Sequence, residues 1–197
     1  LIPDNHEADE NYKLNPISSY AKSKVEIESY LLNKENENFS PTVLRFATAF
    51  GMSPRMRLDL TINEFIYEMV HKKELLVYDP DTWRPYCHVE DLARACVLVL
   101  ECDTEKTANN VFNVGDTKEN YQKKMIVEEI LKIVPDAKIK YIHKDEDPRD
   151  YRVNFSKIQK ALGYTITKTV PDGLREIHSI LTDGLITNSN SPHYRNI

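Results

Sequence analysis

A tyrosine and a lysine four residues apart carry the clearest chemical signal in this sequence. Tyr20 and Lys24 form a YxxxK pattern early in a segment with helical periodicity. Residues four apart project from the same face of a helix, so the hydroxyl and the ammonium group can lie side by side. A nearby cation favours the phenolate form, which would let Tyr20 act as a general base while Lys24 hydrogen-bonds a cofactor ribose. Taken alone, the pattern more often describes a half-exposed aromatic residue beside a solvated charge.

The segment that carries this pair is expected to be a helix from Ser18 to Asn33, because apolar residues recur there without an interior Gly or Pro. An apolar run at 41–50, closed by Gly51, predicts a buried strand. Strands are expected at 74–78, 86–89 and 110–114, further ordered segments at 137–142 and 151–154, and helices at 60–72, 90–102, 121–134, 156–162 and 172–181. This alternation indicates an α/β protein with a largely parallel sheet.

The glycines show what such a fold lacks within this chain. A dinucleotide-binding α/β fold should begin with a strand and a glycine-rich turn that receives phosphate. The five glycines, at positions 51, 115, 163, 173 and 184, are too far apart for a GxGxxG-type turn. We therefore expect the pyrophosphate-binding part of the fold to lie upstream of Leu1.

Composition narrows the class of partner. With 41% hydrophobic and 29% charged residues the chain can build a core, and its net charge of −5 argues against nucleic acid. No apolar stretch approaches the roughly 20 residues that span a bilayer, and the first residues have no signal-peptide pattern, so no membrane partner is expected. Cys87, Cys96 and Cys102 form no CxxC pair, which predicts a reduced, cytoplasmic compartment and no metal site.

Four motifs in order resemble the NAD-dependent epimerase/dehydratase family of extended short-chain dehydrogenases/reductases. Residues 15–24 (NPISSYAKSK) are similar to the start of that family's active-site helix, and residues 84–93 (RPYCHVEDLA) resemble its RDYxHVxDLA segment. Residues 112–115 (FNVG) look like its FNxG strand end. Residues 147–151 (DPRDY), followed by SKI and LGY, are similar to its DxRxY…SKI…LGW run. The resemblance extends from Asn15 to about Leu181.

The resemblance implies the C-terminal portion of a Rossmann-type parallel sheet plus a small α+β substrate-binding domain. Residues 1–51 would end the cofactor domain and include the active-site helix. Residues 52–183 would form mainly the substrate-binding domain, with strands returning to the Rossmann sheet, and residues 184–197 a flexible tail. Full-length members of the family commonly form homodimers, so a homodimer is expected.

The same resemblance assigns the chemistry. Tyr20 would be the catalytic base and acid, with Lys24 as its partner, and both would contact NAD, with NADP left open. A Ser or Thr that completes the set belongs to a segment ending in VYG, expected upstream of Leu1, so the chain alone would be inactive. Tyr20 would take a proton from a sugar hydroxyl while the sugar carbon that bears this hydroxyl gives hydride to NAD. The transient keto-sugar would then be reduced again or lose water.

Four residues are expected to bind the substrate, a nucleotide sugar. Arg84 would hold the diphosphate, since a guanidinium offers a planar fork of donors to phosphate oxygens. Arg149, with Tyr151 beside it, matches a second arginine of the family, and Asn63 matches a substrate-contacting asparagine. Two departures leave the sugar open. Pro85 replaces the usual Asp, and Thr48 stands where an asparagine is common.

Two nearby residues are expected to have structural roles, and three functions stay open. His88 is expected to be structural and Asp91 to cap the following helix. The functions are a sugar-nucleotide epimerase or dehydratase, an NAD(P)-dependent reductase of a non-nucleotide substrate, and a non-catalytic dinucleotide-binding relative. The YxxxK pair argues against the third, and Arg84 with Arg149 favours the first over the second.

Overall fold

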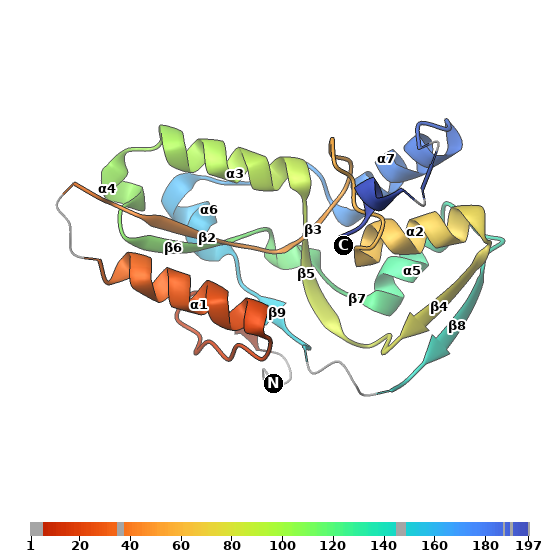
Figure 1. The fold of residues 1–197 in the computed structure, drawn as a ribbon, viewed down its shortest axis with the longest axis horizontal. Helices are drawn as coiled ribbons and strands as arrows, with labels where there is room; N and C mark the ends of the chain where they lie inside the picture. Colours follow the sequence, from red (N-terminus) through yellow and green to blue (C-terminus); the bar gives the residue numbers. More distant parts are fainter. Residues whose placement is uncertain (1–5, 35–37, 145–148, 187, 190, 197) are drawn as a thin grey trace.

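The computed structural model describes residues 6–34, 38–144, 149–186, 188–189 and 191–196; Leu1, Asp147 and Pro148 lie outside them. Strands and helices alternate along the chain (Figure 1). The helices are α1 (Ser19–Leu32), α2 (Thr61–His71), α3 (Val89–Glu101), α4 (Thr104–Thr107), α5 (Lys123–Leu131), α6 (Ser156–Leu162) and α7 (Val170–Thr182), with 3-10 turns η1 (Thr117–Glu119) and η2 (Pro192–Tyr194). The strands are β1 (Glu7–Ala8), β2 (Thr42–Phe46), β3 (Thr48–Phe50), β4 (Glu74–Tyr78), β5 (Trp83–His88), β6 (Asn110–Val114), β7 (Asn120–Gln122), β8 (Lys138–Ile142) and β9 (Arg152–Val153).

Parallel pairing predominates among these strands. The parallel pairs are β2 with β6, β3 with β5, β4 with β8, and β1 with β9, and only β7 runs antiparallel, along β5. In Figure 1, α1 and α3 lie on opposite faces of the β2–β6 pair. Covering both faces is what parallel strands require, since their sheets are buried. The expected α/β class with parallel strands is confirmed.

The single strand expected at 41–50 is in fact two strands. Up to Phe46 the chain pairs with β6, and from Thr48 it pairs with β5. Ala47 lies between them, and its amide donates a hydrogen bond to the Val114 carbonyl at 3.0 Å. The chain changes its partner strand here with no Gly, Pro or charged residue at positions 46–48 to mark the break. The helix expected from residue 121 likewise begins only at Lys123, because β7 is held in the ladder with β5.

Two hydrophobic clusters divide the interior. One joins α3, β6 and α6, and its buried members are Ala47, Cys87, Leu92, Ala95, Phe112, Val114, Phe155, Ile158 and Tyr164. The other joins α2, β4, α5 and α7 and includes the fully buried Ile66, Met69, Val77, Ile126 and Ile177. The expected division into a cofactor-side part at residues 1–51 and a mainly substrate-binding part at 52–183 stays a prediction. In the described part of the chain, no helix is both long and apolar enough to cross a membrane.

The C-terminal segment after α7 lies along α2 and the loop before it. The Leu58 amide donates to the Tyr194 carbonyl at 2.9 Å, and the Tyr67 and Ser189 hydroxyls are 2.5 Å apart. The Asn196 amide donates to the Asp59 carboxylate at 3.2 Å. These bonds give the segment a definite place against α2 and the loop before it, while its flexibility stays a prediction.

Candidate active site

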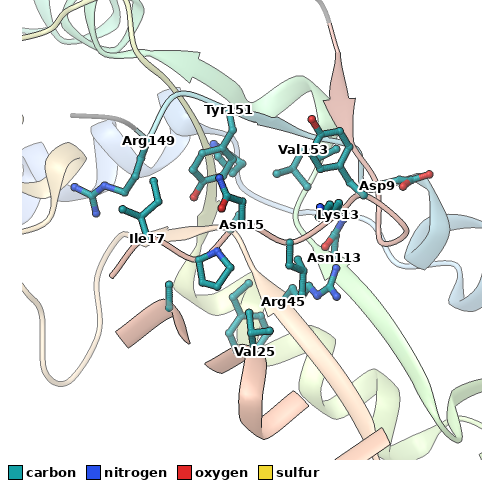
Figure 2. Close-up of a pocket in the computed structure, with 18 of the residues that line it drawn as sticks. Asp9, Lys13, Asn15, Ile17, Val25, Arg45, Asn113, Arg149, Tyr151 and Val153 are labelled. Carbon is teal, nitrogen blue, oxygen red and sulfur yellow. The ribbon is translucent and has the colours of Figure 1, made fainter. Parts of the chain in front are cut away.

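A pocket of about 1060 Å³ lies where β2 and β6 end. Its lining comes from the loop before α1, the last residues of β2, Asn113 of β6 and the segment 149–155 (Figure 2). In parallel sheets, the crevice beyond the carboxyl ends of the strands is the usual place for a ligand. The pocket therefore occupies the position where a fold of this kind binds small molecules.

Three of the predicted substrate residues gather beside this pocket. Arg149 and Tyr151 line it, and the guanidinium carbon of Arg84 lies 5.2 Å from the centre of the Tyr151 ring. A cation over an aromatic face is attracted by the ring. The Trp83 carbonyl accepts hydrogen bonds from the Arg84 guanidinium at 2.7 Å and from the Tyr151 amide at 3.3 Å. The start of β5 and the segment after residue 148 thus hold the Arg84 guanidinium and the Tyr151 phenol together, and Arg149 lines the same pocket.

The predicted catalytic pair lies on α1, next to the pocket rather than in its wall. The Ser18 hydroxyl caps this helix by accepting a hydrogen bond from the Ala21 amide at 3.1 Å. The Lys24 ammonium lies 5.4 Å from the centre of the Tyr20 ring, and Tyr20 is 73% exposed. Ala21 and Val25 do line the pocket. Each follows a member of the pair by one residue, which is a turn of about 100° around the helix axis.

Asn63, the fourth predicted substrate residue, is buried in α2 and bonded to backbone groups. Its side-chain oxygen accepts from the Gly51 amide at 3.0 Å, and its side-chain nitrogen donates to the Arg57 carbonyl at 2.8 Å. Gly51 has a φ of +100°, and a Cβ there would lie 2.1 Å from the His88 ring. The structure therefore places Asn63 apart from the residues beside the pocket, where it holds the turn after β3. Its contact with a substrate stays a prediction.

His88 is buried at the end of β5 and caps α3. Its Nδ1 accepts from the Glu90 amide at 3.3 Å, and its Nε2 lies 2.7 Å from the Glu176 carboxylate of α7. The Lys168 ammonium donates to the same carboxylate at 2.7 Å. Burial acts to raise the pKa of Glu176, but the hydrogen bonds from Lys168 and His88 outweigh it and hold that pKa below its usual value. This cluster joins the end of β5, the start of α3 and the middle of α7.

The expectation that Asp91 caps α3 is wrong. His88 occupies the cap position, and Asp91 is the third residue of the helix, with its side chain turned inward. Its carboxylate accepts from the amides of Thr167 and Lys168 at 2.9–3.0 Å. Asp91 thus binds a segment 76 residues further along the chain, a contact that local spacing does not reveal.

Two basic residues of the pocket were not assigned to the site from the sequence. Lys13 and Arg45 both line it. Arg45 interrupts an otherwise apolar strand, which is a signal that could have singled it out. Lys13 lies in a loop, and its position depends on how that loop folds over β6. Among the described residues, no group of three or more His, Cys, Asp or Glu side chains could hold a metal ion.

Comparison with known families settles the lineage. A sequence profile of the NAD dependent epimerase/dehydratase family matches residues 2–115. The chain belongs to this family. The resemblance carried by the motifs is therefore confirmed.

Two curated relatives are named as sugar-nucleotide epimerases. UDP-glucuronate 4-epimerase 3 of Arabidopsis thaliana is 25% identical over 179 residues, which are 82% of this chain and 41% of the relative. A putative UDP-glucose 4-epimerase of Methanocaldococcus jannaschii is 28% identical over 115 residues, which are 56% of this chain and 36% of the relative. The chain thus spans about two fifths of the length of the curated relatives it matches.

Solved structures share the fold. The UDP-glucuronic acid 4-epimerase of Bacillus cereus, in complex with UDP-glucuronic acid and NAD, aligns with a TM-score of 0.78 at 24% identity. That alignment covers 90% of this chain and 57% of the other. The dTDP-glucose 4,6-dehydratase of Bacillus anthracis, in complex with NAD, aligns with a TM-score of 0.78 at 22% identity, over 93% of this chain and 58% of the other. These similarities confirm the Rossmann-like α/β fold.

Proposed function

We propose that the whole protein is an NAD-dependent sugar-nucleotide epimerase or dehydratase that acts through a transient keto-sugar. The observation that carries the proposal is the gathering of Arg84, Arg149 and Tyr151 beside a pocket bordered by the helix of Tyr20 and Lys24. Guanidinium groups match phosphate oxygens with planar forks of donors. A neutral substrate needs no such pair of arginines. Membership in the family and the names of the relatives support the same class.

Tyr20 is the proposed general base and acid, and Lys24 its charged partner. The ammonium group beside the ring stabilises negative charge that develops on the phenol oxygen when it gives up its proton. Tyr20 can then accept a proton from a sugar hydroxyl and return it later. Arg84 and Arg149 would hold the diphosphate, and Tyr151 and Asn63 are proposed to contact the rest of the substrate.

The side chains of the YxxxK pair fit one side of NAD. Within the described residues, neither the Tyr20 hydroxyl nor the Lys24 ammonium forms a hydrogen bond or ion pair, so both can bind ribose hydroxyls. The 197 residues contain no glycine-rich turn for the pyrophosphate, so this chain offers only part of such a site. When bound, NAD supplies the acceptor for hydride from a sugar carbon.

Kinetics of two variants of the complete gene product would test the proposal, with UDP-, dTDP-, GDP- and CDP-sugars as substrates. Tyr20→Phe removes the proton acceptor and should lower kcat by about 10²–10⁴-fold with little change in substrate affinity. Arg84→Ala should weaken substrate binding by about 1.5–3 kcal/mol, the range for a hydrogen bond to a charged group. The controls are Tyr30→Phe, an exposed tyrosine of the same helix, and Arg175→Ala, an exposed arginine of α7.

The outcomes separate the alternatives. If Tyr20→Phe keeps full activity on a nucleotide sugar that the wild type converts, Tyr20 is not the general base and the proposed role is refuted. Turnover of a non-nucleotide carbonyl alone, unaffected by Arg84→Ala, would favour the reductase. Nucleotide binding without any turnover would favour the non-catalytic relative.

We also propose that the whole protein forms a homodimer and is located in the cytoplasm. No residue of α1 is buried, and Ile27 and Tyr30 are 53% and 66% exposed, which leaves apolar surface for a second copy. The three cysteines are free thiols, which suits a reducing compartment.

A further inference from the structure

Arg45 of β2 ties the helix of the YxxxK pair to the sheet. Its guanidinium donates two hydrogen bonds to the Glu28 carboxylate of α1, at 2.9 and 2.5 Å. Both side chains are largely buried, with 22% and 14% exposed. A bidentate pair of this kind fixes direction as well as distance, because two parallel bonds orient both planar groups.

This pair is the sole polar attachment of α1 within the described chain. No residue of the helix is buried, and no other hydrogen bond or ion pair joins it to another described element. A helix held by so little burial depends on specific contacts for its position, since most helical stability comes from tertiary packing.

The same arginine also holds the loop that leads into the helix. A third N–H group of Arg45 donates to the Glu10 carbonyl at 3.2 Å, and the Glu10 carboxylate accepts from the Asn113 amide of β6 at 2.8 Å. The loop from Glu10 to Ser18, whose hydroxyl caps α1, is therefore tied to both strands at its start. Arg45 contacts the helix and the loop at once, at the edge of the pocket that it lines (Figure 2).

We propose that Arg45 is a positioning residue that acts through Glu28 to set where Tyr20 stands relative to the pocket. The inference rests on the proposed function, because it assigns a catalytic consequence to the position of Tyr20. Displacing a catalytic group by about 1 Å can cost on the order of 10²-fold in rate. Lysine could not replace Arg45, since an ammonium lacks the planar fork that reaches Glu28 twice and Glu10 once.

Hydrogen exchange tests the attachment without any catalytic assay. The variants are Arg45→Gln and Glu28→Gln in the complete gene product, with Arg175→Gln as the matched control, because Arg175 forms an exposed ion pair with Asp172 in α7. Both test variants should speed amide exchange across α1 by about tenfold, which corresponds to about 1.4 kcal/mol of local opening. Exchange in α2 should not change, and the control should match the wild type in both helices.

Kinetics test the consequence for the reaction. Arg45→Gln and Glu28→Gln should each lower kcat by roughly 10–100-fold and leave KM within about twofold, because they misplace Tyr20 without removing a substrate contact. Arg45→Lys should fall between the wild type and Arg45→Gln. If Arg45→Gln does not fold, Glu28→Gln, which keeps the shape of the side chain, decides the test.

Three results would overturn the inference. The first is unchanged exchange in α1 in Glu28→Gln. The second is a raised KM in Arg45→Gln with normal kinetics in Glu28→Gln, which would mean that Arg45 contacts the substrate directly. The third is normal kcat in Glu28→Gln while Tyr20→Phe is inactive, and this leaves the proposed function standing. Full activity of Tyr20→Phe would instead remove the proposed function itself, and the catalytic inference with it.

Discussion

The buried carboxylate of Asp91 links α3 to the segment before α7, and its removal should destabilise the protein strongly. Its side chain has no exposed surface. It accepts from the Thr167 amide at 2.9 and 3.0 Å, from the Thr167 hydroxyl at 2.8 Å and from the Lys168 amide at 3.0 Å. The Arg94 guanidinium adds an ion pair at 2.7 Å.

The expected decrease in the free energy of unfolding follows from the hydrogen-bond donors that Asp91→Ala leaves without an acceptor. Each buried donor deprived of its acceptor costs about 1–3 kcal/mol. Two backbone amides lose theirs, but Thr167 is exposed, so water can reach part of this group. We therefore expect the free energy of unfolding to fall by about 2–4 kcal/mol, and by about half as much in Asp91→Asn, which keeps one acceptor oxygen. Arg94→Ala removes only a half-exposed partner and should cost less than about 1 kcal/mol.

Urea denaturation between pH 3 and pH 8 would measure both the loss and its pH dependence. Burial acts to raise the pKa of Asp91, but the bonds from Thr167, Arg94 and Lys168 hold it below the ordinary value. The stabilisation is thus complete above the unfolded pKa of about 3.9 and is lost as the pH falls through the folded pKa. The difference between wild type and variant should be flat from about pH 5 to pH 8 and shrink below about pH 4. A loss under about 1 kcal/mol at pH 7, or one that grows on acidification, would refute this account.

Three further outcomes are expected. Gly51→Ala should cost about 2–4 kcal/mol, because its Cβ would meet the His88 ring at 2.1 Å. Gly163→Ala, with a similar positive φ but nothing within 4 Å, should cost only about 1–2 kcal/mol; equal losses would contradict the steric argument. Residues 1–197 alone should bind NAD no tighter than roughly millimolar in calorimetry, so micromolar binding would show that the glycine turn is dispensable. Light scattering should detect a dimer of the complete protein that Ile27→Lys weakens, and a monodisperse monomer at high concentration would count against it.

Much of the fold could be predicted because local patterns and tertiary structure agree. The apolar runs form strands, as predicted. The predicted helix from Ser18 to Asn33 corresponds to α1, with Ser18 as its N-cap. The errors lie where tertiary pairing decides. The strand β2 ends at Phe46 and β3 begins at Thr48, because the chain changes its partner from β6 to β5 at Ala47. Periodicity cannot indicate such an exchange, because the sequence pattern of residues 41–50 carries no information on which strand pairs with each half.

The candidate site shows the same division. The spacing of Tyr20 and Lys24 was enough to place them together, since four residues make about one helical turn. Arg84 and Tyr151 are far apart in the chain and were grouped only through the resemblance to a family. Their contact depends on the hydrogen bonds that the Arg84 guanidinium and the Tyr151 amide donate to the Trp83 carbonyl, which no local pattern reveals. The pairing of Arg45 with Glu28 was not expected for the same reason.

The geometry of α1 sets a condition that any substrate of the proposed reaction must meet. The wall of the pocket is formed by Ala21 and Val25, whereas Tyr20 and Lys24 project from the neighbouring face of the same helix. We expect a ligand that reaches the phenol to contact this neighbouring face as well as the wall of the pocket. It must extend past the first turn of α1, where the capping Ser18 lines the pocket two residues before Tyr20. A molecule with an anionic group at one end and a hydroxyl-bearing ring at the other, as we propose for the substrate, satisfies this condition.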